Sequence, residues 1–122
     1  MNNTRSRRVD DAGSVTIEAA IGLSSVVIVL AMCLAGIGCA IGEVRCVDAA
    51  REAARLAARG DGELAAQVVA RLAPAGASLN VQVSGDTVIA TVSATPVGGL
   101  LPAVRLTATA EAAREPTADV RP

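Results

Sequence analysis

The chain is 122 residues long, which is enough for one small domain besides a membrane segment. It contains no histidine, lysine or aromatic residue, and its formal net charge is −1 at pH 7. These absences remove the commonest general base, histidine-paired nucleophiles, lysine-dependent phosphate loops and any basic patch for nucleic acid. We therefore expect a protein that is not an enzyme, binds neither nucleic acid nor a small-molecule substrate, and uses no catalytic residue, cofactor or metal.

A long apolar run follows a short basic leader. Ala19 through Gly42 is a run of 24 residues without a formal charge, enough to cross a hydrocarbon layer of about 30 Å as a helix. Glu18 stands directly before this run, where an ionised side chain is costly and generally functional. Three arginines among the first eight residues favour a cytoplasmic N-terminus, whereas four arginines between residues 45 and 59 favour the opposite orientation. Charge alone therefore leaves the orientation open.

Small residues interrupt the aliphatic side chains of the run. Gly38 and Gly42 have the spacing that lets helices pack closely, so we expect them at contacts between membrane helices. The cysteines, Cys33, Cys39 and Cys46, are odd in number and lack Cys-x-x-Cys spacing, which argues against a metal site or a disulfide framework. We interpret them as small apolar residues at helix contacts, with an intermolecular disulfide at Cys46 as the alternative.

The helical pattern continues beyond the run. The stretch "GEVRCVDAAREAARLAARGDG", residues 42–62, is rich in good helix formers. Its last three arginines, Arg51, Arg55 and Arg59, are expected on a solvated face with Asp48 and Glu52 as local partners. We expect one continuous helix over residues 14–59, closed by Gly60-Asp61-Gly62 as a C-terminal cap. The apolar positions that recur at helical spacing and predict its inner face are Val47, Ala50, Ala54 and Ala58.

A second, short helix is expected over residues 62–73. Leu64, Val68 and Leu72 fall on one face of it and predict the buried side, and Asp61 is the expected N-cap.

The apolar period then changes from helical to alternating. Residues 79–83 and 88–92 alternate around the turn Ser84-Gly85-Asp86 and predict a β-hairpin, and residues 104–110 predict a third strand. The fold class is therefore α+β: a long N-terminal transmembrane helix, then a short helix and a small three-stranded antiparallel sheet. A head of about 60 residues is marginal alone, so we expect it to lean on the exposed half of the long helix.

These patterns divide the chain into five segments. They are a leader (1–13), a membrane-spanning helix (14–42), its exposed continuation (43–60), a small α+β head (61–113) and a flexible tail (114–122).

The N-terminal pattern resembles a known family. A basic leader, Gly13, four residues, Glu18 and a long apolar helix look like the start of a type IV pilin or pseudopilin precursor. More narrowly, "VDAAREAARLAA" and "LLPAVRLTATAEA" resemble TadE-like minor pilins of tight-adherence (Flp-type) pilus systems. The resemblance covers nearly the whole chain.

The resemblance implies a processing site and a set of partners. A prepilin peptidase would cut between Gly13 and Ser14, and Glu18 would pair with the N-terminal amine of a neighbouring subunit. The chain would cross the bacterial cell membrane once, with the leader in the cytoplasm and the head outside, and would reach the cell surface where it enters a pilus. Its partners would be the peptidase, other pilin subunits, the pilus assembly platform and the membrane.

Two departures from the family pattern favour a minor pilin or pseudopilin over the main fibre subunit. Ala19 stands where the major Flp-type pilins usually have tyrosine, and those pilins lack a head of this size. Ser14 also replaces the phenylalanine common at that position in other type IV pilins. Two other readings stay open. One is an uncleaved single-pass scaffold or binding module, and the other is a secreted or lipid-anchored protein with a new N-terminus near Cys33, Cys39 or Glu43.

Overall fold

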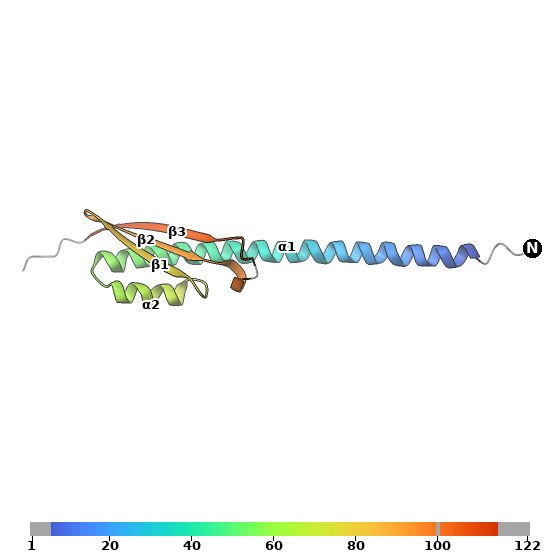
Figure 1. Cartoon of the computed structure of the whole chain (residues 1–122), viewed down its shortest axis with the longest axis horizontal. Coiled ribbons are helices and arrows are strands. Elements are labelled where there is room, and N and C mark those ends of the chain that lie inside the picture. Colours follow the sequence, from blue (N-terminus) through green and yellow to red (C-terminus); the bar gives the residue numbers. More distant parts are fainter. Residues whose placement is uncertain (1–5, 100, 115–122) are drawn as a thin grey trace, which may run out of the picture. The chain divides into compact units, whose positions relative to one another are not determined.

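The computed structural model describes residues 6–99 and 101–114. It confirms the α+β class, with a long apolar N-terminal helix, a short helix and a three-stranded antiparallel sheet (Figure 1). Contacts divide the chain into two compact units, one ending at Gly36 and the other beginning at Ile37. The predicted tail lies outside the described residues from position 115 on, as do the first five residues of the leader. The elements are α1 (Ser6–Ala58), α2 (Gly62–Leu72), β1 (Ser78–Ser84), β2 (Thr87–Ala94), the 3-10 helix η1 (Pro96–Gly99) and β3 (Leu106–Ala113).

The helix α1 begins earlier than the sequence pattern suggests. It starts at Ser6, inside the predicted leader, so the expected start at residue 14 is wrong. No proline interrupts residues 6–13, and the single glycine there costs a helix only about 1 kcal/mol, which is too little to stop it. The predicted cleavage bond between Gly13 and Ser14 consequently lies within a helix.

The C-terminal end of α1 is closed by the predicted cap. Gly60 has a left-handed φ of 90°, and its N–H donates to the carbonyl oxygen of Ala57 at 3.1 Å. The N–H of Asp61 donates to the carbonyl oxygen of Leu56 at 3.0 Å. This pair of bonds satisfies two of the last carbonyl groups of the helix. Asp61 is the N-cap residue of α2, as predicted, and its carbonyl oxygen accepts the N–H of Ala65 at 3.0 Å. Its side chain makes no cap hydrogen bond.

The part of α1 beyond Ile37 buries a face made of very small side chains. The predicted inner positions Ala50, Ala54 and Ala58 are buried, and Val47 is half-buried. The buried face is broader than predicted, because three further residues with exposed fractions of 0% belong to it: Cys46, Ala49 and Ala53. These small side chains form one buried cluster with side chains of α2 and of the sheet, so the described core is packed without aromatic residues.

The helix α2 buries a different face from the one predicted. Ala65 and Val69 face the core, followed by Ala73 just after the helix, while Leu64 and Leu72 remain 48% and 41% exposed. The expectation that these two leucines form the inner face is therefore wrong. The buried positions recur every four residues and carry side chains of a size that suits the alanine face of α1, whereas the leucines flank that contact.

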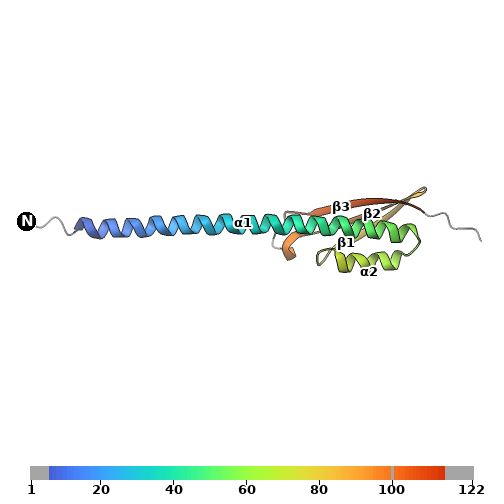
Figure 2. The same cartoon turned by 180° about the vertical axis from the view of Figure 1, so that it is seen from behind.

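The sheet has the order β1-β2-β3, with both pairs antiparallel. The predicted hairpin and third strand are confirmed, and Gly85 supplies the left-handed φ of 60° in the hairpin turn. Val88, Ala90, Val92 and Ala94 alternate inward on the central strand β2 and are all buried. In both views the C-terminal part of α1 and α2 lie on the same face of the sheet, which gives two layers (Figures 1 and 2).

A single glycine sets the distance between α1 and β3. A Cβ atom built on Gly42 would lie 2.7 Å from Cδ1 of Leu106 and 3.9 Å from Cγ of Pro74. Leu106 is only 8% exposed, so its side chain has little room to move away. The absence of a side chain at residue 42 thus lets the helix, β3 and the turn after α2 meet at one point.

We expect Gly42→Leu to destabilise the second unit by about 1–3 kcal/mol, the usual range for overpacking a filled contact. Hydrogen exchange of the β2 amides in detergent micelles as a function of denaturant measures this change. Gly36→Leu is the matched control, because the same gain in helix propensity occurs where nothing lies within 4 Å of the added atom. Equal exchange protection in the two variants would contradict the close contact at Gly42.

Candidate functional site

The predicted cleavage site lies on an exposed part of α1. Gly13 and Ser14 are both exposed, and a Cβ atom added to Gly13 would meet no atom within 4 Å. The backbone of Gly13 does not have a left-handed φ. Neither the backbone conformation nor the available space within this unit therefore requires a glycine at residue 13.

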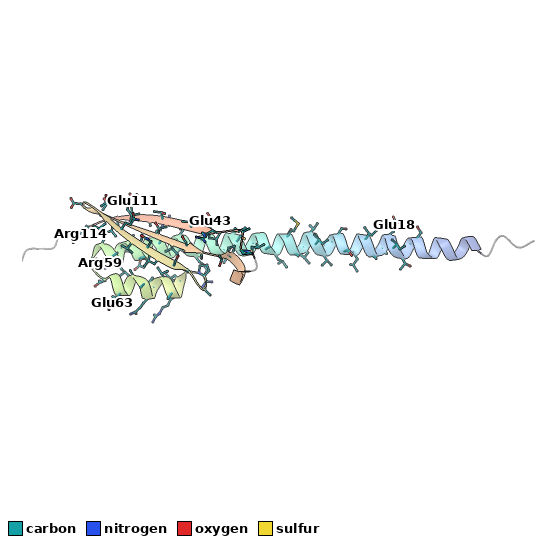
Figure 3. All side chains as sticks on the ribbon, viewed as in Figure 1. Glu18, Glu43, Arg59, Glu63, Glu111 and Arg114 are labelled. Carbon is teal, nitrogen blue, oxygen red and sulfur yellow. The ribbon has the colours of Figure 1, made fainter. Side chains whose placement is uncertain are left out.

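Glu18 stands on the surface of the same helix (Figure 3). Its apolar neighbours Val15, Ile17 and Ile21 are 66%, 63% and 66% exposed. Within the described part of the chain, no hydrogen bond or ion pair holds the Glu18 carboxylate. An ionised carboxylate among exposed aliphatic side chains can be satisfied by a cation from outside the chain.

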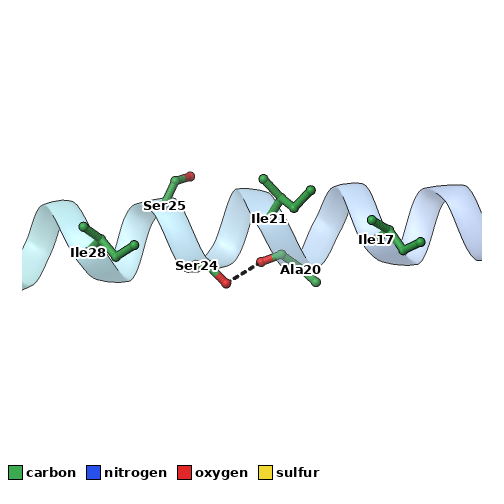
Figure 4. Close-up of a pocket in the computed structure, with 6 residues that line it drawn as sticks. All are labelled: Ile17, Ala20, Ile21, Ser24, Ser25 and Ile28. Carbon is green, nitrogen blue, oxygen red and sulfur yellow. Dashed lines mark hydrogen bonds between the residues drawn. The ribbon is translucent and has the colours of Figure 1, made fainter.

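The helix around and beyond Glu18 is apolar and uncovered. It is long and apolar enough to cross a membrane, with a mean hydropathy of 2.5 and none of the window buried. Ser24 and Ser25 satisfy their hydroxyl groups internally, by donating to the carbonyl oxygens of Ala20 at 2.7 Å and Gly22 at 2.8 Å. Both serines line a groove along one side of the helix, together with Ile17, Ala20, Ile21 and Ile28 (Figure 4). Backbone-bonded hydroxyls of this kind are compatible with a hydrocarbon environment.

The two glycines predicted at membrane-helix contacts lie in the second unit. Gly38 is half-buried, and Gly42 is buried against Leu106 and Pro74 of its own chain. Both line a cavity that the sequence analysis did not foresee. Its other walls come from Ile41 and Arg45 of α1, from Pro74 and Ala75 after α2, and from Pro96 of η1.

Arg45 is a second residue whose role the sequence pattern missed. Its Nε donates to the carbonyl oxygen of Leu72, the last residue of α2, at 3.0 Å. The guanidinium therefore sits at the negative end of the α2 dipole and occupies one of its unpaired carbonyls. Sequence spacing could not reveal this bond, because the two residues are 27 positions apart. Arg55, by contrast, pairs with Glu52 at 3.3 Å on the exposed face, as predicted for the arginines of this stretch.

The three cysteines occupy different environments. Cys33 is exposed, Cys39 is half-buried and Cys46 is fully buried. Burial raises the pKa of the Cys46 thiol above its ordinary value, and the nearby charge of Glu43 adds to the increase, while Arg45 opposes it. The thiol form is thus favoured, and it is packed where a second chain cannot reach its sulfur. Across residues 6–99 and 101–114, no three potential metal-ligand side chains come together.

Comparison with known proteins gives a similarity to one mycobacterial protein. The chain is 46% identical over 99 residues to a protein of Mycobacterium tuberculosis named Apoptosis inhibitor Rv3655c. The aligned region covers 81% of this chain and 78% of that protein. No protein-family model matches the chain, and no solved structure matches it.

We expect Cys46 to be protected from a water-soluble maleimide while the head is folded, because the reactive species is the thiolate and the sulfur is buried. In a Cys33→Ser, Cys39→Ser variant, mass spectrometry should show labelling at least about a hundredfold slower than in denaturant, the factor for an opening cost of roughly 3 kcal/mol.

The pH dependence of Cys46 labelling follows from the direction in which the pKa of its thiol is shifted. The pKa of Cys46 is higher in the folded than in the unfolded state, so its contribution to stability is complete below the unfolded value and is lost as the pH rises through the folded value. The labelling rate of the folded protein should therefore climb more steeply above pH 9.0 than that of the denatured protein. Equal rates in the folded and denatured states at neutral pH would contradict the burial of this thiol.

Proposed function

We propose that this chain, which belongs to the same family as the mycobacterial protein Rv3655c, is a structural subunit of the minor pilin or pseudopilin class, on the sequence pattern of Gly13, Glu18 and the apolar run. In this proposal a prepilin peptidase cuts between Gly13 and Ser14, and the mature chain joins or assists a tight-adherence (Flp-type) pilus. The membrane-capable helix α1 anchors the subunit before assembly, with its N-terminus in the cytoplasm and its head outside.

The observation that carries the proposal is the combination of Gly13 and Glu18 on one uncovered helix. The chain's own fold gives Gly13 no steric or conformational reason to be glycine. Because the fold does not require a glycine at residue 13, the glycine can serve recognition by another protein. In this proposal that protein is the prepilin peptidase. Glu18 follows five residues later in the sequence, beside the start of the apolar run.

The charge of Glu18 supports the assembly step. Cleavage after Gly13 creates a new α-amino group at Ser14, and it also removes the three leader arginines that hold the helix end at the cytoplasmic face. The amine of one subunit can then pair with the Glu18 carboxylate of its neighbour. Two charges that are each costly in hydrocarbon satisfy one another in this way, which favours subunits in register.

The proposal predicts a peptidase-dependent N-terminus. Protein recovered from membranes should begin with Ser14-Val15-Thr16 when the peptidase is present and should retain its leader when the peptidase is absent. Gly13→Leu should block this processing, because a bulky side chain would occupy the position that the peptidase must recognise. N-terminal sequencing and intact mass measure both outcomes.

Gly22→Leu is the matched control for that experiment. Gly22, like Gly13, is an exposed helical glycine with nothing within 4 Å of an added Cβ atom. Processing should persist in this variant. A leader retained in the wild-type chain despite active peptidase would overturn the proposal in favour of an uncleaved single-pass scaffold or binding module.

A separate prediction concerns Glu18. Glu18→Ala should be processed normally but should enter the sheared pilus fraction at least about tenfold less than the wild type, a factor that corresponds to roughly 1.4 kcal/mol. Quantitative immunoblotting of the membrane and pilus fractions measures the ratio. Glu43→Ala, which removes an exposed carboxylate at the other end of the uncharged run, is the control and should be incorporated normally. Normal incorporation of Glu18→Ala would contradict the proposed pairing between Glu18 and the N-terminal amine of a neighbouring subunit.

A further inference from the structure

A cavity of about 300 Å³ lies in the second unit where α1 leaves the apolar run. Its described walls are Gly38, Ile41, Gly42 and Arg45 of α1, Pro74 and Ala75 after α2, and Pro96 of η1. The lining is thus apolar side chains and glycine backbone with one cationic group. The volume is at the lower end of the range for small-molecule pockets, which suits a polar headgroup and not a whole lipid.

Arg45 is held in place within this cavity. The bond from its Nε to the Leu72 carbonyl fixes the plane of the guanidinium. Its two Nη groups make no hydrogen bond or ion pair with the residues that the structure describes. Neither Glu43 nor Asp48, the nearest acidic residues along α1, approaches within ion-pair distance of it in the described structure. The Nη groups therefore remain available for a bidentate contact with an oxyanion, the geometry that a guanidinium offers to phosphate.

The sequence places this group a short way beyond the part of the apolar run that a bilayer core requires. A bilayer core of about 30 Å takes about 20 helical residues, which the run beginning at Ala19 supplies by Gly38. Arg45 is seven residues further on, about 10 Å at 1.5 Å per residue, and helical side chains lean back toward the N-terminus. A headgroup layer is roughly 5–8 Å deep on each side, so the guanidinium reaches the level of the lipid phosphates.

We propose that this cavity binds the phosphate headgroup of an anionic phospholipid, with the Arg45 guanidinium as its ligand. The acyl chains then follow the uncovered side of α1 past Ile41 and Ile37, which are 56% and 57% exposed. The single positive charge of the cavity favours a lipid with net negative charge over a zwitterionic lipid, whose own cation finds no described carboxylate in the cavity wall. This inference requires α1 to lie in a membrane but does not require cleavage after Gly13.

The test uses the full-length chain in vesicles that contain equal amounts of phosphatidylglycerol and phosphatidylcholine. After gentle extraction into detergent, native mass spectrometry counts the lipids that stay bound. The wild type should retain one phosphatidylglycerol in preference to phosphatidylcholine. Arg45→Gln should lower this retention by about tenfold or more, since hydrogen bonds to charged groups are the stronger class. Arg51→Gln, which neutralises an exposed arginine of α1 outside the cavity wall, should retain the lipid as the wild type does.

Arg45→Gln also removes a bond to α2, so a second variant separates binding from folding. Ala75→Trp fills the cavity from an exposed turn position while leaving Arg45 and its bond to Leu72 intact, and it should lower retention comparably. Unchanged retention in Ala75→Trp would overturn the location of the lipid, and equal retention of the two lipids by the wild type would overturn the role of charge. The N-terminal sequence of the same sample reports processing separately, so a failure of cleavage and a failure of lipid binding are distinguishable.

Discussion

The packing of an alanine face of α1 against α2 and a small sheet is the constraint on which the second unit depends. The inner side of α1 offers mainly alanines and Cys46 to the sheet and to α2, with Val47 and Leu56 partly buried beside them. Among the described residues, the largest fully buried side chains are those of Val88, Val92, Pro96 and Cys46. Small side chains bury little apolar area, so each contact contributes little to stability. Stability must then come from backbone proximity and dense packing, because any gap leaves the lining atoms without partners. Gly42 extends this principle to its limit, since even a methyl group would collide with Leu106.

The same constraint reverses the usual distribution of side-chain size. In a soluble domain the large aliphatic residues fill the core, whereas here they gather on the uncovered helix: Val26, Ile28, Leu30 and Leu34 are 57–63% exposed. The small side chains, mainly alanines, fill the core of the second unit. A helix that keeps this much apolar surface for its surroundings gains its stability from a bilayer or from neighbouring helices. The chain thus uses one helix for two purposes, because α1 supplies both the membrane-capable segment and the central wall of the head.

Much of the fold follows from the sequence because the apolar period changes clearly. The alternation over β1 and β2 predicted the hairpin, and the left-handed Gly60 and Gly85 occupy the expected cap and turn. Periodicity could not show which face of α2 is buried, because two neighbouring faces follow the same helical spacing. One carries Leu64 and Leu72, and the other carries the buried Ala65 and Val69. Hydrophobicity favours the leucines, but the residues that pack with the alanine face of α1 are the smaller Ala65 and Val69. The bond from Arg45 to Leu72 and the cavity beside it depend on tertiary contacts, which no local pattern encodes.

The opposite holds for Gly13 and Glu18. The sequence pattern identifies them, whereas the packing of the described residues gives them no role.

The helical state of residues 6–13 of the leader adds a physical condition to the proposed processing. The bond between Gly13 and Ser14 lies inside α1, yet a protease needs its substrate in an extended form, so this part of the helix must open before cleavage. Gly13 weakens the helix by about 1 kcal/mol relative to alanine, which raises the local opening population roughly fivefold at the bond to be cut. The uninterrupted aliphatic run begins only after Glu18, so opening at Gly13 leaves the membrane-capable segment helical. In the proposed processing, a glycine at this position would present no side chain to the peptidase and would lower the cost of opening the helix at the bond to be cut.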